Sequence, residues 1–117
     1  MDESIFTEIK RMLGINDPSY TAFDDELLPL VNSSLADLAL IGVGPKGGLS
    51  IITKNEKWSD LIDNDSTLQN VKEYIYIDVK LVWDPPQNSF LVNSLEKKLD
   101  KLEWHLNIAA DKESSNV

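Results

Sequence analysis

Residues 42–47 read Gly-Val-Gly-Pro-Lys-Gly and match the G-x-G-x-x-G pattern of a turn that cradles the phosphates of a dinucleotide. That chemistry requires a strand before the pattern and a helix after it. Here a helical pattern precedes the glycines, and the residues that follow look extended. A phosphate loop would also need Ser or Thr directly after its lysine, whereas Lys46 is followed by Gly47. We therefore interpret residues 42–47 as a flexible turn and predict no cofactor.

Residues 63–67, Asp-Asn-Asp-Ser-Thr, resemble two acidic motifs. A calcium loop would need glycine at its sixth position and a bidentate Glu at its twelfth, where Leu68 and Tyr74 stand. The aspartyl nucleophile motif of some phosphohydrolases needs an α/β domain larger than this chain. The remaining interpretation is a polar turn that caps a helix starting near Leu68.

His105 is the only histidine, and the chain has no cysteine. A Ser-His-Asp triad or a His–carboxylate metal cluster thus has at most one candidate base, and thiolate metal sites and disulfides are excluded. We expect His105 on the surface, in the last turn of a helix. Asp24 and Asp25 stand where the dipole of a helix start favours negative charge. The sequence predicts no catalytic residue and no metal site, and hence a protein that is not an enzyme.

The charge balance limits the partners of the protein. The chain has 117 residues, the usual size of one domain, with 20 acidic and 11 basic residues and a net charge of −9. DNA wrapping and binding to an anionic membrane both need cationic clusters, so neither is expected. The first residues lack the features of a signal peptide, and no stretch has about 18 uninterrupted apolar residues. A soluble protein without a membrane segment is expected.

The elements that position these residues are mostly helical. Apolar residues recur at helical spacing in three segments, which are residues 3–13, 21–41 and 89–108. Pro29 lies inside the second segment, so we expect either a kink there or a helix that begins close to it. Residues 42–66 are the least regular part, with a short extended stretch over Leu49–Thr53 and a helical turn that buries Trp58.

Residues 68–84 fit two patterns. Alternation of apolar and polar residues from Tyr74 to Trp83 is typical of a strand, whereas the spacing from Leu68 to Val82 is typical of a helix. The length of the pattern favours a helix that is central and well buried. Pro85 and Pro86 must then break the chain, and the last helix should begin near Asn88 or Ser89.

These elements predict a mainly all-α fold. We expect a small bundle of four to five helices with a long glycine-rich loop. The helical domain should comprise residues 1–108, and residues 109–117 should form a flexible C-terminal tail without periodicity.

The stretch over residues 74–86, together with several shorter segments, resembles the small head-tail connector, or adaptor, proteins of tailed bacteriophages and prophages. The most specific is the aromatic and aliphatic stretch over residues 74–86 that ends in Trp-Asp-Pro-Pro. The others are residues 25–28, 32–33, 41–45, 89–90 and 102–107, together with Trp58. The resemblance covers about residues 5–108.

The resemblance implies a structural protein of the virion, at the head–tail interface, that assembles in the host cytoplasm. Such proteins form a ring, dodecameric where it matches the portal, that joins the portal to the tail or to a stopper or tail-completion protein. The ring extends the channel through which DNA passes without specific binding.

Candidate interaction residues come from the loop and from the surplus of aromatic residues. They are Gly44, Pro45, Lys46, Tyr76, Trp83 and Trp104, with Tyr76 and Trp83 favoured as surface anchors. An alternative function is a small acidic regulator that binds a basic or DNA-binding protein. Many acidic residues are explained by helix starts and turns, which weakens that alternative.

Overall fold

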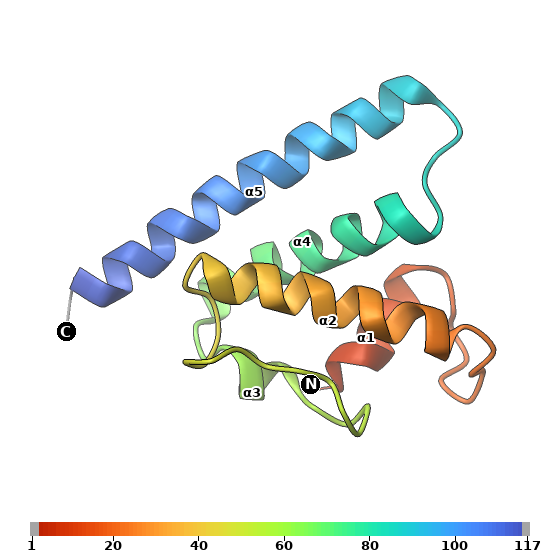
Figure 1. Ribbon diagram of the computed structural model, residues 1–117, viewed down its shortest axis with the longest axis horizontal. Helices are drawn as coiled ribbons and strands as arrows, with labels where there is room; N and C mark the ends of the chain where they lie inside the picture. Colours follow the sequence, from red (N-terminus) through yellow and green to blue (C-terminus); the bar gives the residue numbers. More distant parts are fainter. Residues whose placement is uncertain (1–2, 116–117) are drawn as a thin grey trace.

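The computed structural model describes residues 3–115, which form a small all-helical bundle without strands (Figure 1). The helices are α1 (Ile5–Met12), α2 (Asp24–Leu40), α3 (Trp58–Leu61), α4 (Asp65–Trp83) and α5 (Ser89–Ser115). A single isolated bridge pairs Ser4 with Lys57. The predicted all-α bundle is confirmed. No helix among the described residues is long and apolar enough to cross a membrane.

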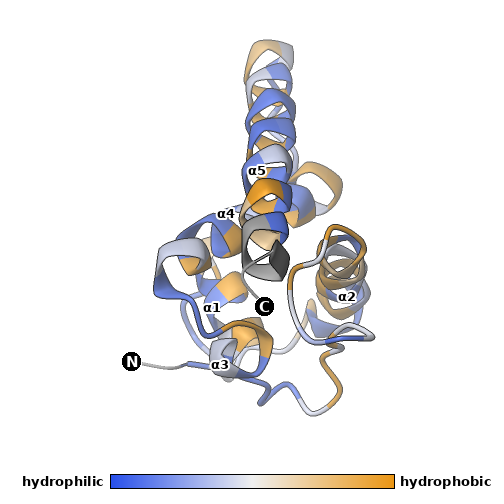
Figure 2. Ribbon diagram, turned by 90° about the vertical axis from the view of Figure 1, so that its left-hand side faces the viewer, coloured by the Kyte–Doolittle hydropathy of each residue, from blue (hydrophilic) through white to orange (hydrophobic). Residues whose placement is uncertain are grey.

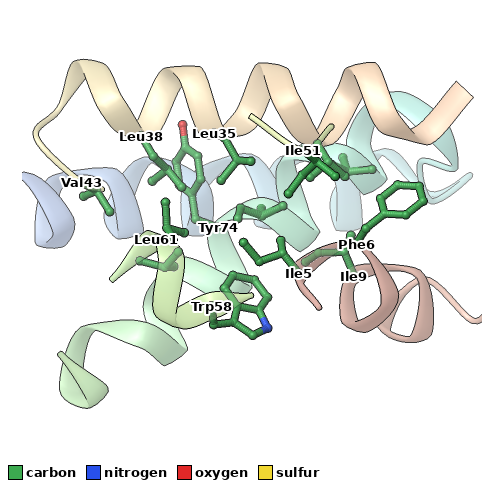
Figure 3. Packing of buried hydrophobic residues seen from close by; sticks show 14 of the residues in the cluster. Ile5, Phe6, Ile9, Leu35, Leu38, Val43, Ile51, Trp58, Leu61 and Tyr74 are labelled. Carbon is green, nitrogen blue, oxygen red and sulfur yellow. The ribbon is translucent and has the colours of Figure 1, made fainter. Parts of the chain in front are cut away.

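The centre of the bundle is α4, which packs against α1, α2 and α5. Ile75, Ile77 and Tyr74 have exposed fractions of 0%, 2% and 4%, although they point to different sides of this helix. Burial on several sides explains why the same residues also fit the alternation of a strand, and the helical interpretation is confirmed. Apolar side chains from α1, α2 and α3 close the core around it (Figure 3).

Helix α2 begins at Asp24 and continues through Pro29. Of the two alternatives expected at Pro29, a helix that begins close to the proline is therefore wrong. Burial of Leu27 and Val31, both at 0% exposure, holds the turns on either side of the proline against the core. The proline cannot donate to the carbonyl of Asp25, but Asp25 is exposed, so water can hydrate that carbonyl.

After α2 the chain turns back and runs alongside it. Asn32 fixes this return, because its side chain accepts a hydrogen bond from the Ile51 N–H (2.6 Å) and donates to the Ile51 carbonyl (3.2 Å). Further along, Lys54 forms an ion pair with Asp24 at 3.1 Å. We call residues 48–57 the strap. The extended stretch expected at Leu49–Thr53 lies in the strap and pairs with no strand among the described residues.

Glu56 closes the strap on itself. Its carboxylate accepts hydrogen bonds from the N–H groups of Ile52 (2.9 Å) and Thr53 (3.1 Å), and its own carbonyl accepts from the Ile5 N–H (2.8 Å). Partial desolvation alone would raise the pKa of Glu56, but the backbone N–H donors lower it to about 2. Glu56 thus closes the strap through its carboxylate and holds the start of α1 through its backbone carbonyl.

Glu56→Gln should destabilise the protein at pH 7 by about 1 kcal/mol, because hydrogen bonds to a charged acceptor become bonds to a neutral one. The pKa is lower in the folded than in the unfolded protein, so the carboxylate contributes full stability above about pH 4.5 and loses it as pH falls toward 2. Urea unfolding at pH 7 and pH 3 measures this. The difference in stability between the proteins should shrink at pH 3, and an unchanged difference would contradict the assignment.

The last helix begins at Ser89, as predicted, with the side chain of Asn88 accepting from the Phe90 N–H at 2.8 Å. Its end differs from the prediction. The sequence indicated a loose tail from residue 109, whereas α5 continues to Ser115. Ala109 and Ala110 are strong helix formers that extend the helix without any apolar stripe. Residues 116 and 117 of the expected tail lie outside the described residues.

Candidate interaction surfaces

The glycines of the loop after α2 allow close packing. Gly42 and Gly44 have φ angles of +94° and +102°, which residues other than glycine rarely adopt. A Cβ atom at Gly42 would lie 3.0 Å from the Ala110 Cβ, and one at Gly44 would lie 2.9 Å from a methyl carbon of Leu61. The loop follows a helix and leads into the strap, so the glycines are explained by contacts with α5 and α3.

A shallow pocket of about 390 Å³ lies between this loop, the end of α3 and the C-terminal half of α5. Gly44 and Pro45 line it together with Asp60 and Asp63, while Lys46 is exposed outside it. The three loop residues predicted to contact a partner are thus accessible to one. Their role stays a prediction.

The polar segment predicted to cap a helix near Leu68 does cap α4, but the helix begins three residues earlier, at Asp65. Asn64 is the capping residue, and its side chain accepts from the Ser66 N–H at 3.0 Å. Among residues whose placement is described, no group of three or more His, Asp or Glu side chains is arranged to hold a metal ion.

Two of the aromatic residues favoured as surface anchors are half-buried. Tyr76 packs against the core from α4. The ring of Trp83 packs edge-on against Phe23, with centroids 5.4 Å apart, and its Nε1–H donates to Glu26 at 3.3 Å. Trp83 therefore fastens the end of α4 to the start of α2, with only part of its ring available to a partner.

Two ionisable groups of α4 have raised pKa values. Burial raises the pKa of the Asp78 carboxyl, and the nearby Asp37 carboxylate raises it further. Burial likewise raises the pKa of the Tyr74 hydroxyl, with contributions from Asp78 and Glu103. These shifts come from packing acidic groups between α2, α4 and α5, so helix packing accounts for them.

Trp104 is the most exposed of the predicted aromatic residues, at 63%. It lies on α5 beside a depression that it lines with Ile41, Asn107 and the acidic residues Asp100 and Glu103. Its ring meets the ring of His105 edge-on, with centroids 5.4 Å apart, and His105 is exposed as expected.

One side of α5, outside its apolar stripe, was not recognised from the sequence. The spacing from Phe90 to Lys97, Lys101 and Trp104 is seven, four and three residues, which places these side chains in one row along the helix. Phe90 is 75% exposed. We define the α5 outer face by the exposed residues of this side, which are Phe90, Leu91, Ser94, Lys97, Lys98, Lys101, Trp104 and His105. It has three lysines, and the exposed acidic residues Asp100 and Asp111 border it beside Trp104.

A second face lies on the solvent side of α2. Its exposed residues are Asp25, Glu26, Pro29, Ser33, Ala36, Asp37 and Leu40, which we define as the α2 outer face. It has three acidic residues and no basic one, and Leu40 is 85% exposed at its end. Helical spacing of the residues that do not enter the core was the signal that could have revealed both faces.

The geometry defines an acidic, all-helical protein that exposes several large apolar side chains, among them Leu40, Phe90 and Trp104. A family model described as phage connector protein matches residues 5–113, so the chain belongs to this family. It is thus a structural protein of the bacteriophage head–tail connector. No curated protein and no solved structure matches the chain significantly.

Proposed function

We propose that copies of this protein form a ring between the portal and the tail, or between the portal and a stopper protein, and that this ring extends the DNA channel. The family membership of residues 5–113 is the observation that carries the proposal. The ring has twelve subunits where it matches a dodecameric portal, a number that rests on the resemblance to adaptor proteins. It acts without cofactor and catalyses no reaction.

The charge of the protein supports the proposed channel. A net charge of −9 makes a ring of many copies strongly acidic, so its wall repels DNA phosphates. DNA then slides through without being held, which suits a passage used for both packaging and ejection. The basic residues of the chain are too few to hold DNA against this repulsion.

We further propose that the protein lies at the head–tail interface of the virion and is assembled there in the bacterial cytoplasm. Two parts of the surface suit docking to another chain, either a neighbouring ring protein or a second copy of this protein. The first is the exposed loop with Gly44, Pro45 and Lys46, and the second is the exposed ring of Trp104. Exposed aromatic residues are frequent anchors of protein interfaces.

Electron microscopy of purified portal rings mixed with the protein tests the proposal. A collar of added density below the portal is the expected result, and loss of the gene should give DNA-filled heads that leak and lack tails. Normal infectious particles without the gene would overturn the proposal. Release of a DNA-binding protein from DNA, with no binding to portals, would instead identify a small acidic regulator.

A further inference from the structure

The α5 outer face is unusual for this molecule. Lys97, Lys98 and Lys101 provide three of the chain's 11 basic residues, on one side of one helix, in a protein of net charge −9. Lys98 lies at the edge of this face, 3.8 Å from Glu73 of α4. Among the described residues, no ion pair joins Lys97 or Lys101 to an acidic side chain.

The face also exposes apolar surface. Phe90 and Leu91, at 75% and 50% exposure, stand at the start of α5, where the helix rises away from α1, α2 and α3 (Figure 2). At the opposite end of the face, Trp104 is 63% exposed. A row of lysines framed by large apolar side chains fits a partner that offers carboxylates together with apolar or small residues.

The α2 outer face offers that chemistry. Asp25 and Asp37 lie twelve positions apart, about 18 Å along the axis at 1.5 Å per residue. They lie on opposite flanks of the face, because twelve positions turn about 120° round the helix. Between them Ser33 and Ala36 present small side chains, so another helix can approach closely, and Leu40 adds an apolar contact. Neither face belongs to the core of the bundle.

We propose that the α5 outer face of one copy packs against the α2 outer face of the next copy. The inference rests on the proposed ring and names the two surfaces that build it. If a face of one copy packed against the same face of another copy, charges of the same sign would lie opposite one another. A two-fold contact through either face is therefore disfavoured. Contact between two different surfaces is head-to-tail, and repetition of such a contact gives a closed ring when the rotation closes.

Cysteine cross-linking tests the contact directly, because the chain has no cysteine of its own. Chains carrying Ser94→Cys on the α5 outer face are mixed with chains carrying Ser33→Cys on the α2 outer face. The matched control pairs Ser94→Cys with Ser66→Cys, which is exposed at the start of α4. The first mixture should form the disulfide-linked heterodimer about tenfold faster, because the contact raises the local concentration of the two thiols.

Exchange of charges between the two faces provides a second test. Light scattering measures the size of the assemblies that each variant forms. Lys97→Glu with Lys101→Glu should abolish self-association, and Asp25→Lys with Asp37→Lys should do the same. All four substitutions in one chain should restore it, because each face then meets the opposite charge again. Lys57→Glu with Gln69→Glu, outside both faces and outside the loop of Gly44, Pro45 and Lys46, should leave it unchanged.

The outcomes separate this inference from the proposed function. Equal cross-linking of both mixtures, with or without portal rings present, overturns the α5–α2 contact, as does a four-substitution chain that stays dispersed. A collar on the portal without the 33–94 cross-link leaves the ring proposal in place and rejects these surfaces.

The 33–94 cross-link without any binding to portals supports the contact and rejects the portal role. Binding of the α5 outer face to DNA in place of a second copy would also reject the contact.

Discussion

Asp24→Ala should lower the free energy of unfolding by about 3–5 kcal/mol, because it leaves the buried ammonium of Lys10 without its counter-charge. Both side chains are 4–5% exposed, and the Lys10 Nζ lies 2.9 Å from one carboxylate oxygen of Asp24. Lys54 approaches the other oxygen at 3.1 Å. Burial would raise the pKa of Asp24, but the two lysines lower it overall, so the carboxyl is charged at neutral pH.

Lys10 would keep one partner in this variant, since its Nζ also donates to the Tyr20 carbonyl at 2.7 Å. A carbonyl does not neutralise the charge, so the destabilisation remains large. A domain of this size has a stability of about 5–15 kcal/mol, and the variant should therefore unfold at much lower urea concentration. Far-ultraviolet circular dichroism during urea titration measures the shift.

Lys10→Met combined with Asp24→Ala is the matched control. Removing both charges leaves no uncompensated buried ion, so the double variant should regain a large part of the lost stability. If the double variant were as unstable as Asp24→Ala alone, the loss would come from packing or from the Lys54 contact. In that case the buried ion pair would not be its cause.

Trp58→Ala should cost a similar amount, about 3–5 kcal/mol, by opening a large cavity. The side chain is 2% exposed, and its Nε1–H donates to Glu8 of α1 at 3.1 Å. The ammonium of Lys72 from α4 lies 5.3 Å from the ring centroid, within the range of a cation–π contact. One residue of α3 therefore connects α1 with α4, and its loss removes all of these contacts together.

Trp58→Phe separates packing from the polar contacts. It keeps an aromatic ring in the core but cannot donate to Glu8, so its loss of stability should be clearly smaller than that of the alanine variant. Urea unfolding, followed by circular dichroism, gives both values. An alanine variant within about 1 kcal/mol of the parent protein would show that the core refills the space and that the assigned role is wrong.

The helices could be predicted because their apolar residues recur with the period of a helix. Residues 68–84 were ambiguous, since a helix buried on several sides has apolar residues at nearly every spacing, and length alone favoured the correct structure. The cap at Asn64 and the start at Ser89 followed from side chains that bond to neighbouring backbone groups. Burial of Trp58 was predicted from its apolar neighbours.

The course of the strap could not be predicted, because it depends on contacts between distant residues. Asn32 binds Ile51 across 19 positions, and no local pattern reports such a pair. The end of α5 was missed for the opposite reason. Residues 109–115 include the good helix formers Ala109, Ala110, Lys112 and Glu113 but have no apolar stripe, and the interpretation relied on the stripe.

The candidate site was predicted only in part. Exposure of the loop residues and of Trp104 agrees with a role in binding, but Tyr76 and Trp83 are half-buried. The outer faces of α2 and α5 were overlooked because polar positions were interpreted as solvated surface. The spacing of apolar residues along one chain does not show which side chains contact another copy.

The position of α4 has a consequence for how the polypeptide is made. Among the described residues, every extensive helix–helix contact includes α4. A nascent chain emerges from its N-terminus, so the apolar sides of the first two helices have no large surface to cover them until residues 65–83 have been synthesised. Co-translational folding of the first half therefore has to wait for the second.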